Sequence, residues 1–148
     1  MSKLTEMLRR HEGEVKNSAG RHIVYTCPAG HATIGIGRNI AKSGLGLSDI
    51  EVEFLLEEDV ARCASELGRE FPFFSGLDDV RRDAMIDICF NIGITRLKGF
   101  AMALGAMARD DYDTAATEFL RSRWADQVGN RAKELAAMIR TGEYQSIG

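Results

Sequence analysis

Three side chains near the start of the chain have the types and spacing to hydrolyse a bond with a positioned water molecule. They are Glu12, Cys27 and Thr33, and Thr33 lies six positions beyond Cys27. A carboxylic acid can protonate a leaving group, while a thiol and a hydroxyl can hold or activate water. The sequence therefore predicts an acid, a possible base and a water-holding hydroxyl in one site.

Glu12 is expected in the last turn of an amphipathic helix. Residues of one face recur there at helical spacing: Leu4, Met7, Leu8 and His11. Ser2 is a suitable N-cap and Gly13 a suitable C-terminal stop. The negative end of a helix disfavours a carboxylate, so the dipole and partial burial both favour the protonated form that a general acid needs. Judged from this residue alone, a surface glutamate beside a helix end is the commoner alternative.

Cys27 and Thr33 are expected on either side of a turn. Ile23–Thr26 has the β-branched and aromatic character of a strand, and Thr33 opens the next one. Pro28 and Gly30 between them are turn signals. In the functional interpretation, the thiol and the hydroxyl hold one water molecule. The alternative is a half-buried cysteine beside an ordinary strand residue, because free cysteines are usually buried apolar groups.

The remaining pattern predicts an α+β fold that is mostly helical. Residues 14–45 indicate a sheet lobe with two or three short antiparallel strands. The capping box Ser48-Asp49-Ile50-Glu51 starts a long helix that runs to about Gly68. Further helices are expected from Asp78 and over Arg96–Met107, Tyr112–Leu120 and Arg131–Arg140, the last capped by Asn130 and stopped by Gly142.

We expect one domain over residues 1–148 with two lobes. The helical lobe covers about 69–148 together with the N-terminal helix. The long helix joins it to the sheet lobe, and a cleft is expected between the lobes.

Composition narrows the class of protein. The chain has 148 residues, of which 45% are apolar and 28% charged, the profile of a soluble globular domain. No apolar run is long enough to span a membrane, so we expect no membrane insertion. The N-terminus has no apolar signal segment, which predicts that the chain starts in the cytoplasm. A net charge of −3 leaves no basic footprint for nucleic acid.

Cysteine and histidine usage argues against a disulfide framework and a metal site. The cysteines are odd in number and form no Cys-x-x-Cys pair, which is typical of a reducing compartment: Cys27, Cys63 and Cys89. Cys63 and Cys89 lie in helical apolar patterns and are predicted core thiols. The histidines, His11, His22 and His31, lack metal-ligand spacing, so we expect neither metal nor cofactor. A hydrolase dyad of Cys27 with His22 or His31 is a further alternative.

Short motifs follow one another along nearly the whole chain. The first are Met7-Leu8-Arg9-Arg10-His11-Glu12-Gly13, Tyr25-Thr26-Cys27-Pro28-Ala29-Gly30 and Thr33-Ile34-Gly35-Ile36-Gly37. The next are Leu77-Asp78-Asp79-Val80-Arg81-Arg82, Phe90-Asn91-Ile92-Gly93 and Lys98-Gly99-Phe100. The last are Ser122-Arg123-Trp124, Asn130-Arg131-Ala132 and Arg140-Thr141-Gly142. This series resembles the phage-type lysozymes, glycoside hydrolase family 24, and implies a lysozyme-like fold.

The resemblance implies a role for each candidate residue. Glu12 would be the general acid on the glycosidic oxygen, Cys27 stands where the family has aspartate or cysteine, and Thr33 would orient the attacking water. The family cleaves the β-1,4 bond between N-acetylmuramic acid and N-acetylglucosamine in bacterial peptidoglycan. Arg131 matches an arginine placed beside the catalytic glutamate. Positions that contact the sugar chain are occupied here by Asn39, Phe90, Asn91, Ala103 and Glu118, whereas Trp124 is expected to pack in the helical lobe.

Two features depart from the family pattern. The stretch from Glu12 to Cys27 is longer than usual, and we expect the extra residues to extend a hairpin around Asn17–Gly20 that leaves Glu12 and Cys27 facing each other. The net charge of −3 predicts weaker electrostatic steering toward an anionic wall than in basic lysozymes. Cys27 has three possible roles, namely base for water, covalent nucleophile or positioning group, and the resemblance favours water activation with inversion.

The leading functional hypothesis is an endolysin that acts as a monomer on bacterial peptidoglycan. It would accumulate in the host cytoplasm until a separate holin-type pore lets it reach the cell wall. One alternative is a lysozyme-fold module that binds peptidoglycan with little catalysis. Another is a lysozyme domain carried by a virion.

Overall fold

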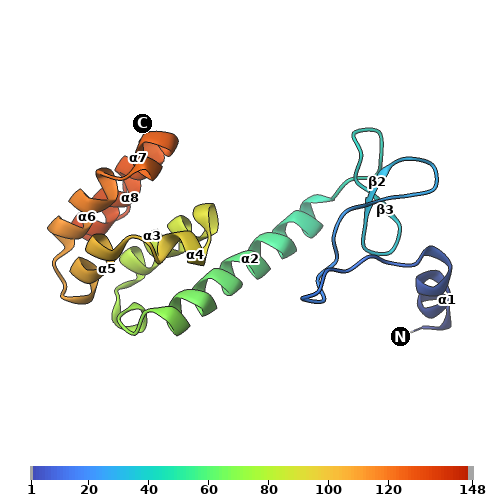
Figure 1. Ribbon diagram of the computed structural model, residues 1–148, viewed down its shortest axis with the longest axis horizontal. Coiled ribbons are helices and arrows are strands. Elements are labelled where there is room, and N and C mark those ends of the chain that lie inside the picture. Colours follow the sequence, from blue (N-terminus) through green and yellow to red (C-terminus); the bar gives the residue numbers. More distant parts are fainter. Residues whose placement is uncertain (1, 147–148) are drawn as a thin grey trace. The chain divides into compact units, whose positions relative to one another are not determined.

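The computed structural model describes residues 2–146 and confirms the predicted α+β class, with a small sheet and several helices. The chain forms two compact units, which we call the sheet unit (Met1–Phe54) and the helical unit (Leu55–Gly148). Figure 1 labels their elements. Helix α1 is counted with the sheet unit, so its assignment to a helical lobe stays a prediction. Among the described helices, none combines the length and the apolar character that crossing a membrane requires.

Helix α1 (Lys3–Glu12) begins and ends where its caps predict. The Ser2 hydroxyl accepts a hydrogen bond from the Thr5 N–H at 3.1 Å. At the other end Gly13 has a φ of 71°, and its N–H donates to the Arg9 carbonyl. A side chain would be strained at that φ, so glycine is the residue that ends the helix here at lowest cost. Glu12 is therefore the last helical residue, as expected.

A hairpin occupies the segment between α1 and the sheet. Lys16 and His22 form an antiparallel bridge, and the Ile23 N–H donates to the Val15 carbonyl at 3.1 Å. The Asn17 side-chain oxygen closes the turn by accepting from the N–H groups of Ala19 and Arg21, both at 3.0 Å. The extra length after Glu12 is thus folded into a hairpin around Asn17–Gly20, where the sequence predicted it.

Three short strands form the antiparallel sheet, in the order β1 (Tyr25–Thr26), β2 (Ala32–Ile34) and β3 (Arg38–Asn39). The predicted strand over Ile23–Thr26 is shorter than expected, because Ile23 already belongs to the preceding hairpin. The register pairs Tyr25 with Thr33 and Thr33 with Asn39. These three residues therefore lie in one row across the sheet.

Helix α2 (Asp49–Glu70) starts at the predicted capping box. The Ser48 hydroxyl accepts from the Glu51 N–H at 3.2 Å, and the Glu51 carboxylate accepts from the Ser48 N–H at 2.9 Å. Arg38 reaches the same carboxylate at 2.8 Å and so ties β3 to the start of α2. These hydrogen bonds lower the pKa of Glu51 to about 2, with the Arg38 guanidinium as the largest cause.

The helical unit contains most of α2, a short 3₁₀ helix, η1 (Phe74–Gly76), and six further α-helices. These are α3 (Asp79–Ile92), α4 (Ile94–Leu97), α5 (Ala101–Ala108), α6 (Tyr112–Leu120), α7 (Arg123–Val128) and α8 (Asn130–Thr141). Helix α8 packs against α3, α6 and α7, while α5 packs against α6. The start of α3 behind Asp78 and the bounds of α6 agree with the sequence prediction.

Three predictions for this unit are wrong in detail. The helix expected over Arg96–Met107 is interrupted, because α4 ends in a tight turn in which the Gly99 N–H donates to the Arg96 carbonyl. Helix α7 was not predicted, since six residues are too few to show a helical period. Asn130 does not cap α8: Gly129 takes that position, with no side-chain hydrogen bond. The predicted stop at Gly142, with a φ of 73°, is confirmed.

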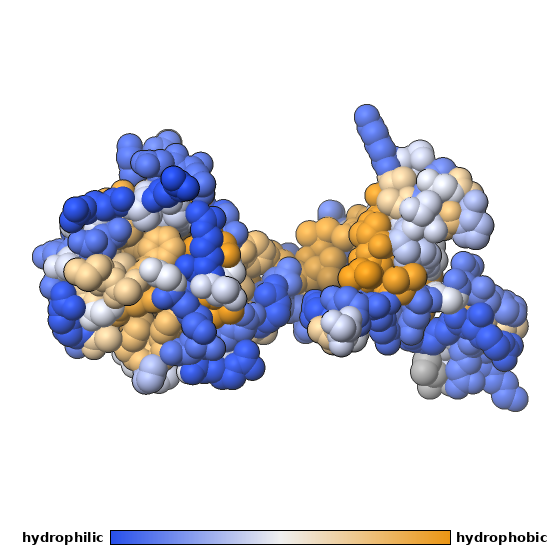
Figure 2. Space-filling model, viewed as in Figure 1, coloured by the Kyte–Doolittle hydropathy of each residue, from blue (hydrophilic) through white to orange (hydrophobic). Residues whose placement is uncertain are grey.

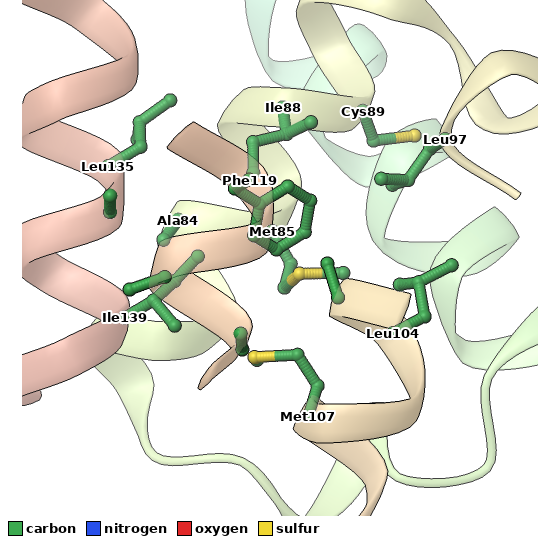
Figure 3. Packing of buried hydrophobic residues seen from close by; sticks show 14 of the residues in the cluster. Ala84, Met85, Ile88, Cys89, Leu97, Leu104, Met107, Phe119, Leu135 and Ile139 are labelled. Atoms are coloured by element: carbon green, nitrogen blue, oxygen red, sulfur yellow. The ribbon is translucent and has the colours of Figure 1, made fainter. Parts of the chain in front are cut away.

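The core of the described chain lies in the helical unit. Figure 3 shows Phe119 of α6 among side chains from neighbouring helices, including Met85 and Ile88. Phe119 and Trp124 pack edge to face with ring centroids 6.3 Å apart. Trp124 is buried, as expected, and so are the thiols of Cys63 and Cys89. Burial raises the pKa of Cys89 to about 12, so this thiol is inert at neutral pH.

Candidate active site

The structure brings Glu12, Cys27 and Thr33 into the wall of one cavity in the sheet unit. Its volume is about 320 Å³. The full lining consists of Glu12, Tyr25, Cys27, Pro28, Ala29, Thr33, Gly37 and Asn39. The cavity thus combines a carboxyl group, a thiol and a hydroxyl, which are the three groups that the sequence predicted together.

The sheet register explains why these side chains share a face. Tyr25, Thr33 and Asn39 are paired across the three strands, and paired residues project to the same side of a sheet. Cys27 lies two positions beyond Tyr25 and therefore projects to that side as well. Its N–H donates to the His31 carbonyl at 2.9 Å, which continues the ladder by one residue. One face of the small sheet is accordingly the floor of the cavity.

Glu12 reaches the cavity from the end of α1 because position 37 has no side chain. A Cβ built on Gly37 would lie 2.9 Å from the Glu12 Oε2 atom, closer than real Cβ contacts allow. Gly37 also has a φ of 75°, a conformation that L side chains rarely adopt. The glycine-rich turn after β2 therefore gives the carboxyl group of Glu12 its place against the sheet.

Cys27 sits in a ring of hydrogen-bond donors at the β1–β2 turn. The His31 N–H donates to the Cys27 Sγ at a distance of 3.4 Å. This contact is the largest cause of a lowered pKa at the thiol; desolvation acts in the opposite direction. The N–H groups of Ala29 and Gly30 add to the lowering. Donors aimed at sulfur stabilise the thiolate, so Cys27 is more acidic than an ordinary cysteine.

Thr33 is the one buried polar residue of the described chain, with 2% of its surface exposed. Its Oγ1 donates a hydrogen bond to the His31 carbonyl at 2.9 Å. A hydroxyl has a single proton and two lone pairs. With its proton on His31, Thr33 can accept a hydrogen bond from water, and the thiolate of Cys27 beside it can accept another.

Two further polar groups complete the cavity wall. The Asn39 Oδ1 accepts from the Ala41 N–H at 2.9 Å, which leaves its amide N–H₂ to donate to a bound molecule. Tyr25 donates its hydroxyl proton to the Gly35 carbonyl at 3.3 Å. Asn39 was among the predicted sugar contacts, and the structure places it with the three candidate catalytic groups.

The other predicted site residues lie in the helical unit. Phe90 and Arg131 line a cavity of about 350 Å³. There Arg131 pairs with Asp87 at 2.8 Å, and its predicted place beside the catalytic glutamate stays a prediction. Phe90 is 45% exposed.

Ala103 and Glu118 share a separate cavity of about 200 Å³. Ala103 is buried, and Glu118 is paired with Arg121 at 3.3 Å. Asn91 stands apart from both cavities and accepts a hydrogen bond from the Trp124 indole N–H at 2.8 Å. This bond orients the Asn91 amide and also satisfies the one polar atom of the buried indole.

Sequence reasoning missed Tyr25 and Gly37 as members of the site. Both carried a usable signal. Tyr25 lies two positions before Cys27 in a strand pattern, which puts the two on one face. Gly37 closes a Gly-x-Gly turn directly after β2. Within residues 2–146 no group of three or more His, Cys, Asp or Glu side chains is arranged to hold a metal ion.

The chemistry available in this cavity is hydrolysis. A carboxyl group, which is the kind of group that can donate a proton, stands on one wall. A thiol with a lowered pKa and a buried hydroxyl stand on the sheet as acceptors for water protons. The asparagine amide can bind a carbonyl or hydroxyl oxygen of a polar substrate.

Comparisons with known proteins point to one family. The model of the phage lysozyme family matches residues 16–141. The chain is 25% identical to the probable T4-type lysozyme 1 of Dictyostelium discoideum and 24% identical to the probable T4-type lysozyme 2 of the same organism, over 96% of each chain. It is also 26% identical to the pre-baseplate central spike protein Gp5 of Enterobacteria phage T4, of which it spans 29%.

Proposed function

The chain belongs to the phage lysozyme family, and on that premise we propose that Glu12, Cys27 and Thr33 are its catalytic groups. Family membership confirms the predicted class: the protein is a lysozyme, a hydrolase whose substrate is peptidoglycan. The observation that carries the residue assignment is that these three side chains line one cavity of about 320 Å³.

The proposed reaction is hydrolysis of the β-1,4 bond between N-acetylmuramic acid and N-acetylglucosamine. Glu12 gives its proton to the glycosidic oxygen as that bond breaks. A water molecule held between Cys27 and Thr33 attacks the anomeric carbon from the opposite face. As the new C–O bond forms, the Cys27 thiolate takes a proton from that water, so charge and protons balance. Attack by water on the opposite face inverts the anomeric centre.

Cys27 acts as the base in this proposal rather than as a covalent nucleophile. Backbone N–H donors around its thiol lower its pKa, which favours the thiolate form that a base requires. Thr33 lies beside it with its proton committed to the His31 carbonyl, so its lone pairs can fix the second hydrogen of the water. To act as a base, Cys27 needs a position beside the water molecule and a thiolate that can accept its proton.

Replacement of Cys27 tests the assignment. Cys27→Ala removes the base and is expected to reduce turbidity clearing of bacterial walls about 100-fold or more, the usual size of a general-base effect. Cys27→Asp restores a base and should keep most of the activity. It should also stay active at lower pH than the parent protein, because a carboxylate remains charged far below the pKa of a thiol. Equal activity of the Ala and Asp variants would rule out a chemical role for the thiol.

The products identify the bond. Cleavage by a muramidase releases new reducing ends, and borohydride reduction followed by mass spectrometry locates them on N-acetylmuramic acid. Release of amino termini without reducing ends would assign an amidase or peptidase instead. Wall binding without either product would favour the catalytically weak binding module.

We further propose that the helical unit binds the remote part of the sugar chain and that the protein works as a monomer. Phe90, Asn91, Ala103 and Glu118 would contact sugar residues together with Asn39 of the sheet unit, and Arg131 would support Glu12. The setting is host lysis as an endolysin: accumulation in the cytoplasm, then passage to the wall through a holin-type pore. Expression with and without a holin tests this, since lysis should require both.

Similarity to the T4 spike protein favours a second setting, a lysozyme carried by a virion. The catalytic chemistry would be the same in both settings. Quantitative mass spectrometry of purified particles separates them, because a virion component remains in stoichiometric amount through density-gradient purification, whereas an endolysin stays in the soluble lysate.

A further inference from the structure

A second cavity in the sheet unit shares the Glu12 wall of the candidate active site. Its volume is about 300 Å³, and its lining consists of Thr5, Leu8, Arg9, Glu12 and Ile36. Glu12 is the one residue common to the two linings. A group bound in this second cavity would therefore be a close neighbour of the bond that Glu12 protonates.

The lining of the second cavity suits an anionic group on a partly apolar stem. Leu8 and Ile36 supply apolar surface, and Arg9 supplies a guanidinium group. The Arg9 side chain is 51% exposed, and its nearest carboxylate oxygen, on Glu14, lies 3.9 Å away. By contrast, the Arg38–Glu51 pair measures 2.8 Å. Arg9 is thus loosely paired, and a planar guanidinium binds carboxylates with two parallel hydrogen bonds.

Basic groups around Arg9 outnumber the carboxylate that they share. Lys16 lies 3.4 Å from Glu14, and the His22 ring nitrogen lies 3.7 Å from it. The two cations Arg9 and Lys16 therefore share the single carboxylate of Glu14, with the His22 ring beside it. On the face shown in Figure 2, hydrophilic side chains cover most of α1.

The net charge of the chain conceals this local excess. Residues 1–48 hold seven of the 19 Lys and Arg residues but three of the 22 Asp and Glu residues, a net charge of +4. Residues 49–148 carry the remaining −7. The segment that contains both cavities is therefore cationic in a protein whose total charge is −3. Such a segment attracts anionic polymers at close range even when the whole chain does not.

We propose that the second cavity binds a carboxylate of the stem peptide of peptidoglycan, with Arg9 as the anchoring residue. The inference rests on the proposed function, because it takes Glu12 to lie at the scissile bond. The stem peptide is attached to the muramic acid lactyl group, next to that bond, and carries free carboxylates. In the proposed function Glu12 gives up a proton, so the proposal requires that Glu12 carry this proton, and therefore no charge, while the substrate is bound. Binding there would make Arg9 a specificity-determining residue for peptide-bearing glycan.

Equilibrium binding to three tetrasaccharides tests the proposal. The first probe alternates N-acetylglucosamine with N-acetylmuramic acid and carries tetrapeptides, the second is the same glycan with free lactyl groups, and the third is an oligomer of N-acetylglucosamine without carboxylates. The parent protein and its Arg9→Gln variant are titrated with each probe in a calorimeter at low salt. Arg10→Gln is the matched control, because it removes the same charge from the next residue of α1, outside the cavity lining.

Arg9→Gln is expected to weaken binding of the peptide-bearing probe about tenfold, the size of a lost charged hydrogen bond, and to leave the other two probes unchanged. Arg9→Lys should recover part of the loss, and Arg10→Gln should leave all three affinities unchanged. An equal loss on the free-lactyl probe would assign the contact to the lactyl carboxylate and overturn the stem-peptide proposal. No loss on any probe, or the same loss with Arg10→Gln, would overturn it as well.

Binding as the readout separates this inference from the proposed function. A parent protein that prefers the peptide-bearing probe through Arg9 but releases no reducing ends would refute the catalytic assignment and support the Arg9 site. If the parent protein cleaves glycan and Arg9→Gln binds all probes normally, the catalytic assignment is supported and the Arg9 site is refuted. In the cleavage assay, Arg9→Gln should raise KM on peptide-bearing strands and leave kcat unchanged, as expected for a residue that binds but does not react.

Discussion

The helical unit buries a continuous cluster of apolar side chains, whereas in residues 2–54 the one buried residue is the polar Thr33. The sheet unit takes its shape instead from turns and hydrogen bonds. Most glycines with positive φ lie in it: Gly13, Gly20, Gly30, Gly35, Gly37 and Gly46. Apolar packing stabilises a fold without exposing reactive groups, while turns present backbone N–H groups and side chains to a cavity. The candidate catalytic groups accordingly lie where the packing is weakest.

This contrast predicts that a change in the catalytic cavity can abolish activity at little cost in stability. Glu12→Gln keeps the shape of the side chain and removes its acidic proton. Wall lysis should fall about 100- to 10,000-fold, the range of a general-acid contribution. The thermal unfolding midpoint should stay within a degree or two of the parent value, because Glu12 ends a solvent-exposed helix. A variant that folds normally and lyses walls at the parent rate would refute the assignment.

The helical core should respond in the opposite way. Ile88 is fully buried on α3, and Ile88→Ala is expected to lower the free energy of unfolding by about 2–5 kcal/mol. Chemical denaturation followed by Trp124 fluorescence measures this loss, since that indole lies in the same cluster. At temperatures where the variant remains folded, lysis per molecule should match the parent. A large loss of specific activity in the folded variant would show that the core also sets the geometry of the reaction.

Two glycines of the β2–β3 turn separate backbone strain from a steric effect on Glu12. Gly37 and Gly35 both have positive φ, 75° and 63°. A Cβ at Gly37 would meet Glu12 at 2.9 Å, whereas a Cβ at Gly35 would meet nothing within 4 Å. Each Ala substitution should cost about 1–2 kcal/mol in stability. Gly37→Ala should in addition reduce kcat about tenfold or more, because it would displace the proposed general acid Glu12. Equal kcat values for the two variants would contradict the placement of Glu12.

Local signals in the sequence were enough for much of the fold. Caps and stops at Ser2, Gly13 and the Ser48–Glu51 box depend on residues within one helical turn, and the structure has them where the sequence predicted. The bounds of α6 also agree with the predicted range, Tyr112–Leu120. The break between α4 and α5 was missed, although Gly99, whose N–H donates to the Arg96 carbonyl, is a glycine of the kind that marked the ends of other helices.

The candidate site also has features that the sequence predicted and features that only the fold revealed. The types of Glu12, Cys27 and Thr33 suggested their chemistry, but their meeting depends on strand register, which pairs Tyr25 with Thr33. The Arg131–Asp87 pair joins residues 44 positions apart, and no local pattern announces such a contact. Likewise, Arg9 was part of a recognised motif, yet its place in a cavity wall beside Glu12 required the fold. Contacts between residues far apart in the chain could not be predicted from local sequence patterns.

The smallest expected effect concerns the ion pair that fixes the start of α2. Arg38 and Ser48 lower the pKa of Glu51 to about 2, whereas an unfolded glutamate titrates near 4.3. A carboxylate with a lowered pKa in the folded state adds stability above the unfolded pKa and loses it as the pH falls toward about 2. Glu51→Gln should therefore speed amide hydrogen exchange at residues 48–52 near pH 7, and the difference from the parent should shrink as the pH falls from about 4.3 to 2.

Glu53→Gln is the matched control for this prediction. Glu53 belongs to the same helix but makes no ion pair within residues 2–146. Its replacement should leave exchange near the start of α2 unchanged at every pH. If both variants changed exchange equally, the effect would come from the net charge of the helix rather than from the Arg38–Glu51 pair. Residues 2–54 contain no apolar core. That outcome would therefore mean that the Arg38–Glu51 pair contributes little to the stability of the sheet unit.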